Sequence, residues 1–250
     1  MATRRCFLFC CFMLIFTACT HVKQQGGIVF SFDDDYIDEW HEFKNVFSEH
    51  GIKATFFISN PQSLDSLKVL KLKDLQNDNH EIACHGYNHL NCLDYSDSID
   101  IYIKKEITLA INSLKNKGFN VVSFAYPYGE STSYIDSVLL SYFTFLRKAT
   151  YNIHNTNIDA YDEIYVSSSS TRVCNAMGID CNYAISLENL EKAIQRAVNN
   201  NEILVLYAHK INNSGEDYTI SPEYLKKAFQ LCNKYKIQSL RMKDISVFPF

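Results

Sequence analysis

Two periods of apolar and polar positions recur along the chain. Short apolar runs rich in β-branched and aromatic residues predict buried strands, and apolar residues three or four positions apart predict amphipathic helices. Expected strands cover residues 28–32, 53–59, 81–85, 121–126, 143–149, 164–168, 203–208 and 237–240; expected helices cover residues 37–50, 64–76, 99–117, 134–140, 187–198 and 222–235. This alternation indicates a parallel sheet joined by right-handed crossovers, either open or closed into a barrel.

The first expected strand ends at three consecutive carboxylates, Asp33, Asp34 and Asp35. Taken alone, they also fit a solvated turn with an acidic helix cap. Polar groups follow three other expected strands, however, at His85 and His89, at residues 126–129 and at His209. Because the carboxyl ends of parallel strands lie on one face, these groups are expected to converge.

The converging side chains suit a divalent metal. His85 and His89 are four residues apart, a spacing at which two imidazoles can bind one cation, although paired surface histidines show it too. An aspartate would complete a two-histidine, one-carboxylate set that suits zinc and similar ions. A second aspartate could act as a general base, and His209 as the general acid for a leaving group.

Composition limits the function classes. The 250-residue chain has a formal net charge of −4 and 47% hydrophobic residues, with only 8 Gly and 4 Pro. A net negative charge argues against nucleic acid as a partner, because phosphate binding needs clustered Lys and Arg. The length fits one well-buried globular domain rather than two.

The amino terminus has the layout of a secretory signal. Two arginines precede an apolar run at residues 6–16, and small residues precede Cys19. The sequence FTAC resembles a bacterial lipobox, which predicts a lipoprotein signal peptide at residues 1–18, lipidation of Cys19, a tether at residues 19–26 and a catalytic domain at residues 27–250. The alternative is a plain cleaved signal. We expect a lipid-anchored protein of the bacterial cell envelope, periplasmic or surface-facing.

Five cysteines follow Cys19, an odd number for an oxidising compartment. Cys174 and Cys181 bracket a short segment that a disulfide could close. No CxxC pair is present, which argues against a thiolate zinc site.

The motifs together resemble the polysaccharide deacetylases with a NodB-homology domain, carbohydrate esterase family 4, over residues 27–245. The family's TFDDG, H(S/T)xxH, RxPYG and late leucine-and-histidine motifs match SFDDD at 31–35, HGYNH at 85–89, AYPYG at 125–129 and LYAH at 206–209. This resemblance implies a distorted (β/α) barrel of about seven parallel strands. It also implies a metal-dependent hydrolase that removes N- or O-acetyl groups from a carbohydrate polymer or oligomer by attack of metal-bound water.

The resemblance also assigns roles to residues. The metal ion would be zinc, with cobalt or nickel as alternatives, and the substrate an acetylated glycan. Asp33 would be the catalytic base, His209 the acid, and the Tyr128 N–H a donor to the oxyanion. The assigned metal ligands are Asp34, His85 and His89, and the groove residues are Tyr126, Pro127 and Tyr128.

Three departures from the family pattern affect the site. Ala125 replaces an arginine that pairs with the base aspartate, and Arg147 and Arg172 are the candidates to supply that guanidinium. Asp35 replaces a glycine, and Gly86 replaces a Ser or Thr. The acidic partner of the catalytic histidine has no clear match, with Asp159 and Asp162 as candidates.

The alternative function is a carbohydrate-binding envelope lipoprotein that has lost turnover.

Overall fold

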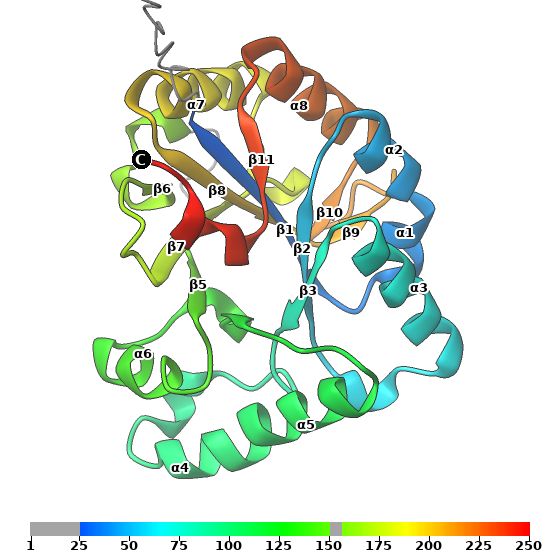
Figure 1. Cartoon of the computed structure of the whole chain (residues 1–250), viewed down its shortest axis with the longest axis vertical. Coiled ribbons are helices and arrows are strands. Elements are labelled where there is room, and N and C mark those ends of the chain that lie inside the picture. The colour runs from blue at the N-terminus through cyan, green and yellow to red at the C-terminus, as the bar shows by residue number, and fades with distance from the viewer. Residues whose placement is uncertain (1–25, 151–156) are drawn as a thin grey trace, which may run out of the picture.

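Seven parallel strands close into a barrel in the computed structural model, which describes residues 26–150 and 157–250 (Figure 1). In spatial order they are β1 (Gly27–Asp34), β2 (Ala54–Ile58), β3 (Glu81–Cys84), β4 (Ser123–Ala125), β5 (Phe145–Ala149), β7 (Val173–Gly178) and β8 (Ile203–Ala208). Pairing of β8 with β1, from Gly27↔Ile203 to Phe32↔Ala208, closes the ring. The expected barrel of about seven parallel strands is confirmed.

Four short strands lie outside this ring. β11 (Gln238–Leu240) pairs in parallel with the first three residues of β1, on the side where β2 pairs with the rest of that strand. β6 (Tyr165–Val166) pairs antiparallel with β8. β9 (Lys210–Ile211) and β10 (Thr219–Ile220) pair with each other beyond the carboxyl end of β8.

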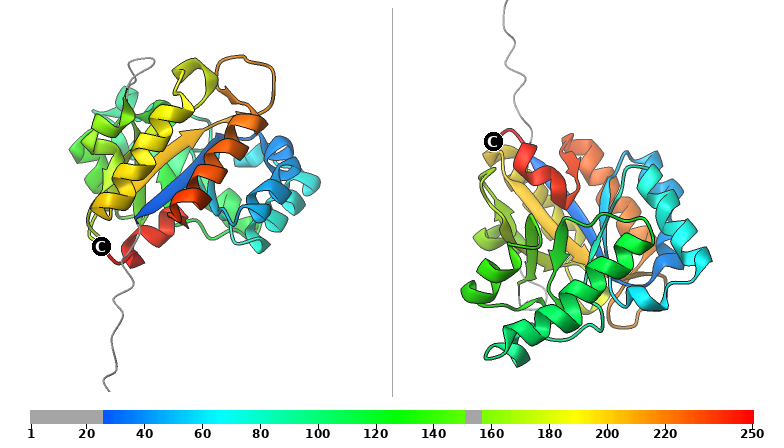
Figure 2. Two further views of the ribbon diagram at one scale, coloured as in Figure 1. Left: turned by 90° about the horizontal axis from the view of Figure 1, so that it is seen from above. Right: turned by 60° about the horizontal axis from the view of Figure 1, so that its bottom comes forward.

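Helices cover the outside of the barrel (Figures 1 and 2). They are α1 (Ile37–Glu42), α2 (Lys44–Glu49), α3 (Ser66–Asn77), α4 (Ile99–Tyr102), α5 (Leu109–Asn116), α6 (Ser133–Leu139), α7 (Leu187–Asn200) and α8 (Pro222–Tyr235). A π-helical segment, Ile103–Thr108, joins α4 to α5. No helix within residues 26–150 and 157–250 is long and apolar enough to cross a membrane.

The alternation of side chains along β1 sets both the core and the site. Phe30 and Phe32 point outward into the layer between barrel and helices, where Phe32 packs on Trp40 and stacks on Phe56. Val29 points into the barrel interior with Phe57. Because successive side chains of a strand face opposite ways, Asp33 lies on the inward side as Val29 does.

The amino end of the barrel is closed by the carboxyl-terminal segment of the chain. Met242 and Ile245, from a 3₁₀ segment after β11, are buried in the interior cluster. The buried Glu81 carboxylate accepts hydrogen bonds from Ser123 Oγ at 2.7 Å, Thr55 Oγ1 at 3.2 Å and the Lys243 N–H at 3.0 Å. The opposite end of the barrel, at the carboxyl ends of the strands, is not covered by this segment and can hold a functional site.

Two expectations from the sequence need correction. Strand β7 is absent from the expected elements, and the less certain strand at residues 164–168 is only the two-residue β6. The proposed disulfide between Cys174 and Cys181 is wrong, because both are free cysteines. Cys174 lies in β7 with its thiol on the Leu146 carbonyl, whereas the Cys181 thiol is directed to the Glu216 carbonyl.

The expected signal peptide at 1–18, Cys19 and most of the tether lie outside the described residues. The first described residues, Gly26 and Gly27, lead into β1 at the amino end of the barrel.

His80 makes the stability of the fold depend on pH. Its Nδ1 accepts the Ala54 N–H at 3.0 Å, and burial lowers its pKa from 6.5 to about 4. Between pH 6.5 and 4 the unfolded chain therefore binds a proton that the folded chain does not, so stability is lost as the pH falls. The expected loss is about 3 kcal/mol. Urea unfolding of the metal-free protein between pH 7 and 4 would measure it.

The control for this prediction is His80→Asn, which keeps an acceptor for the Ala54 N–H but does not titrate in this range. Other groups, including His85, titrate identically in both proteins, so the difference in slope isolates His80. Equal slopes in the two proteins would show that His80 does not carry the effect.

Candidate active site

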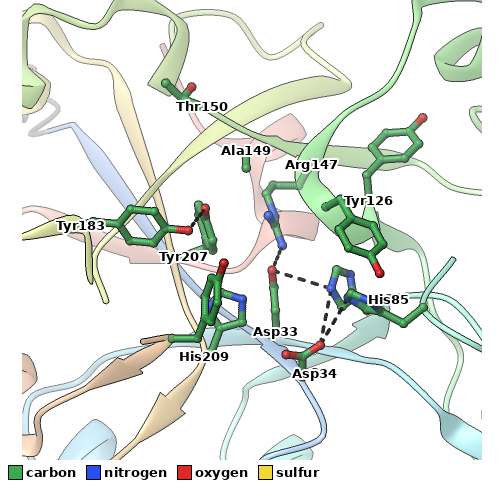
Figure 3. A pocket seen from close by; sticks show the side chains of 14 residues that line it. Asp33, Asp34, His85, Tyr126, Arg147, Ala149, Thr150, Tyr183, Tyr207 and His209 are labelled. Atoms are coloured by element: carbon green, nitrogen blue, oxygen red, sulfur yellow. Dashed lines mark hydrogen bonds and ion pairs between the residues drawn. The ribbon is translucent and has the colours of Figure 1, made fainter. Parts of the chain in front are cut away.

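The carboxyl ends of the strands surround a cavity of about 410 Å³ (Figure 3). Asp33 and Asp34 reach it from β1, Arg147 from β5 and Tyr207 from β8. The turns after these and the neighbouring strands add further lining residues: His85, His89, Tyr126, Tyr128, Tyr183 and His209. The structure thus brings together side chains that are up to 176 positions apart in the sequence, as the strand pattern predicts.

Asp33 forms a buried ion pair at the base of the cavity. Its Oδ2 accepts a hydrogen bond from Arg147 Nη2, and both side chains are almost fully buried. Burial alone would raise the pKa of Asp33, but Arg147, His85 and His209 lower it below its usual value, so the carboxylate is ionised at neutral pH. Its Oδ1 is buried and accepts no hydrogen bond from any described residue.

The position of Arg147 follows from strand register. Arg147 on β5 is the direct partner of Ala125 on β4, so its side chain enters the space beside that alanine. The rings of Phe57 and Tyr207 lie near the guanidinium, with centroids 5.3 and 4.9 Å from Cζ. The other candidate, Arg172, instead donates to the main-chain carbonyls of Thr144 and Phe143 at 2.9 and 3.0 Å. Arg147 is therefore the arginine that contacts Asp33.

Asp34, His85 and His89 form a cluster suited to a metal ion. Asp34 Oδ1 lies 3.9 Å from His85 Nε2 and 3.5 Å from His89 Nε2. Two ligands each about 2.1 Å from a tetrahedral zinc are about 3.4 Å apart, so the donor atoms already stand near coordinating distances. His85 Nδ1 lies 2.9 Å from the Ala125 carbonyl, which fixes Nδ1 as the protonated nitrogen and leaves Nε2 with a lone pair. The cluster fits a divalent ion.

His209 lies across the cavity and is bound to Asp180. Asp180 Oδ2 is 2.7 Å from His209 Nδ1, and Oδ1 accepts the His209 N–H at 3.0 Å. Burial opposes the imidazolium, but the hydrogen bond and charge of Asp180 outweigh it and raise the pKa of His209. The indole of Trp40 donates to the His209 carbonyl at 2.8 Å, so the backbone of His209 is fixed as well.

The expected acidic partners of His209, Asp159 and Asp162, are wrong. Asp162 pairs with Arg196 at 2.8 Å, and the Asp159 carbonyl accepts from the same guanidinium at 2.7 Å, away from the cavity. Asp180 lies two residues after the end of β7, the strand that the sequence pattern did not predict. An acid at the end of a strand is the signal that would have identified it.

The AYPYG turn forms one wall of the cavity. Tyr126 is buried and donates its hydroxyl to Asp136 at 2.8 Å, and Pro127 is buried beside it. Tyr128 has a left-handed backbone, with φ 64° and ψ −1°, and its exposed ring lies 5.1 Å from the His89 ring. Gly129 follows with φ 76°, where a Cβ would lie 2.4 Å from the Ala149 Cβ. The turn thus packs directly against the end of β5.

Asp35 points away from this cluster. Its carboxylate is 3.8 Å from Lys68 Nζ on α3, and it does not line the cavity. The extra charge is therefore partly compensated on the outer side of the barrel.

The fold and the site are those of a (β/α)-barrel enzyme with its side chains gathered at the carboxyl ends of the strands. The family model for polysaccharide deacetylase matches residues 21–142. This match, which covers just under half of the 250 residues, makes the chain similar to polysaccharide deacetylases. No curated protein matches it.

Solved structures share the fold at low sequence identity. The Xyl-CE4 domain of a multidomain xylanase from the hindgut metagenome of Trinervitermes trinervoides is 16% identical, with 89% of this chain and 90% of that chain covered and a TM-score of 0.57. The chitin deacetylase of Colletotrichum lindemuthianum is 13% identical, with 89% and 88% covered and a TM-score of 0.58. A mutant of a CE4 family pseudoenzyme with restored enzymatic activity is 13% identical, with 90% and 68% covered and a TM-score of 0.56.

Replacing Arg147 tests the ion pair directly. Arg147→Met should lower the free energy of unfolding by about 3–5 kcal/mol, because it leaves the Asp33 carboxylate buried without a cation. Urea unfolding at pH 7 in the presence of a chelator measures the change. The matched control is Arg147→Met with Asp33→Asn, which removes both charges and should recover most of the loss. Equal losses in the single and double variants would contradict the pairing.

Proposed function

We propose that the protein is a metal-dependent deacetylase that removes N- or O-acetyl groups from a carbohydrate polymer or oligomer. The observation that carries this proposal is the position of the Asp34, His85 and His89 cluster, next to Asp33 and in the same cavity as His209. The match to the polysaccharide deacetylase family model over residues 21–142 supports the substrate class.

Asp34, His85 and His89 would hold the ion, for which we propose zinc, with cobalt or nickel as alternatives. A bound divalent ion would polarise the acetyl carbonyl and lower the pKa of a water molecule in the site. The fixed Nδ1 of His85 supports a ligand role, because it presents Nε2 to the cavity in the neutral tautomer.

The other side chains of the cavity would carry out the proton transfers, one as the base and one as the acid. Asp33, ionised and with Oδ1 unpaired among the described residues, would accept the proton of the attacking water. His209, whose raised pKa favours the imidazolium, would donate a proton to the departing amine or alcohol. The Tyr128 N–H would stabilise the oxyanion, and Arg147 would orient the base. Each role rests on a side chain or amide of this cavity.

The alternative, a glycan-binding protein without turnover, depended on the absence of an arginine at position 125. The contact between Arg147 and Asp33 weakens that argument, since a guanidinium reaches the base from the neighbouring strand. The fold alone does not guarantee turnover, because one similar structure is of a pseudoenzyme mutant with restored activity. Acetate release is therefore the deciding measurement.

We further propose that Cys19 anchors the protein to a membrane of the bacterial cell envelope, periplasmic or surface-facing. The layout of residues 1–19 supports this. In the described residues the chain enters at the amino end of the barrel, whereas the cavity lies at the carboxyl ends of the strands. An anchor before β1 would thus leave the cavity accessible to a glycan.

Acetate release tests the enzyme. Metal-stripped protein should release no acetate from N-acetylglucosamine oligomers or acetylated xylan, and added zinc or cobalt should restore release. His85→Ala should abolish both metal binding and release. Asp33→Asn should retain the metal and lose about 10²- to 10⁴-fold in rate, because a general base supplies about that factor.

The control for this experiment is His50→Ala, which removes a histidine at the end of α2, away from the cavity. It should release acetate at the wild-type rate. Folded, metal-loaded protein that releases nothing from either substrate would overturn the proposal in favour of the glycan-binding alternative.

Asp180 should set the upper pH limit of activity. Its carboxylate raises the pKa of His209, so Asp180→Asn should lower that pKa and the imidazole should lose its proton at a lower pH. We expect the alkaline limb of kcat/KM to move down by about one pH unit or more. The control is Asp162→Asn, whose carboxylate pairs with Arg196 instead. An unmoved alkaline limb in Asp180→Asn would exclude His209 as the acid.

A further inference from the structure

A buried carboxylate outside the cavity holds the turn between His85 and His89. Glu106 is fully buried, and its Oε2 accepts the Tyr87 N–H at 2.8 Å. The Asn88 N–H donates to both oxygens, at 2.9 Å to Oε1 and 3.0 Å to Oε2. Two of the three residues between the histidines are therefore bound through their backbone to one side chain.

This carboxylate has no ion-pair partner among the described residues, since no Lys, Arg or His nitrogen lies within salt-bridge distance of it. A buried carboxylate needs hydrogen-bond donors or a cation to offset its lost hydration. The amides of the turn supply the donors here. The turn and Glu106 thus depend on each other.

Gly86 makes the approach of Glu106 possible. A Cβ at this position would lie 2.6 Å from Glu106 Oε2, closer than real Cβ contacts allow, and its φ of 87° is one that L side chains rarely adopt. His89, at the other end of the turn, also has a left-handed backbone, with φ 59°. Such a conformation persists only where neighbouring groups determine it.

Glu106 belongs to the π-helical segment Ile103–Thr108, which interrupts the helix between α4 and α5. A π-bulge changes which side chains and carbonyls face a neighbouring loop and often occurs at functional sites. The same segment provides the Lys105 carbonyl, which accepts from Asn88 Nδ2 at 3.2 Å. The Glu106 carboxylate and the Lys105 carbonyl, which bind the turn, therefore both lie in the π-helical segment.

We propose that Glu106 is a positioning residue that sets the separation and direction of His85 and His89 through the backbone of the turn between them. This inference rests on the proposed role of the two histidines as metal ligands. Glu106 does not line the cavity, so its effect on the site passes through the backbone of Tyr87 and Asn88.

Zinc affinity tests the proposal. In purified, metal-stripped protein, Glu106→Ala should raise the zinc dissociation constant about 10- to 100-fold, the range typical of residues that orient metal ligands. Competition with a chromophoric chelator measures this without reference to activity. Glu106→Gln keeps the size of the side chain but only one acceptor oxygen, and should show a smaller increase. The matched control is Lys104→Ala, an exposed neighbour in the same segment, which should bind zinc as wild type does.

Hydrogen exchange of the metal-free protein provides a second, independent measurement. The amides of Tyr87 and Asn88 should exchange faster in both Glu106 variants than in wild type or Lys104→Ala. Unchanged exchange in a folded Glu106→Gln protein overturns the proposal, as does a zinc dissociation constant within twofold of wild type in folded Glu106→Ala. If wild-type protein binds no zinc, the proposed function fails, and the exchange result alone decides whether Glu106 holds the turn.

Discussion

The rest of the site depends on the buried ion pair between Asp33 and Arg147. A carboxylate inside a barrel is unfavourable without a cation, and the guanidinium arrives from the strand next to the one where the family motif carries its arginine. The ring of Tyr207 lies beside the guanidinium, and its hydroxyl is 2.8 Å from that of Tyr183. Tyr183 fits only because Gly178 has no side chain, since a Cβ there would lie 2.2 Å from the ring. One charge on β1 therefore constrains residues on β5, β7 and β8.

Two histidines of the cavity are oriented in the same way, but their pKa values are shifted in opposite directions. His85 and His209 each engage Nδ1 and present Nε2 to the site. The Nδ1 partner of His85 is the neutral Ala125 carbonyl, and burial lowers the pKa of His85 to about 4. His209 is also buried, but its partner is the Asp180 carboxylate, and its pKa is raised. A neutral imidazole suits a metal ligand and a cationic one suits a general acid. The group that binds Nδ1 therefore decides the role of each histidine.

The strand pattern predicted a parallel sheet and the convergence of the motifs, because strand period and the polar residues at strand ends are local signals. The closed barrel was implied only by the family resemblance. It could not choose between Arg147 and Arg172, since that choice depends on the register of β5 against β4. Asp180 was missed for a related reason. β7 reads VCNAMG, where Asn175 and the small residues hide the apolar signal of a strand. Without that strand, no pattern placed Asp180 at the same face as His209.

The turns that present these groups are strained, whereas the barrel beneath them is regular. Asp34, His89 and Tyr128 have φ values of 86°, 59° and 64°, each at a position where a side chain or amide faces the cavity. Such conformations cost on the order of 1–3 kcal/mol each, a sizeable part of the roughly 5–15 kcal/mol by which domains are stable. Strand pairing and the aromatic layer around Phe32 must offset that cost. The geometry of the site is therefore maintained by the core of the barrel, because the turns alone would relax to unstrained conformations.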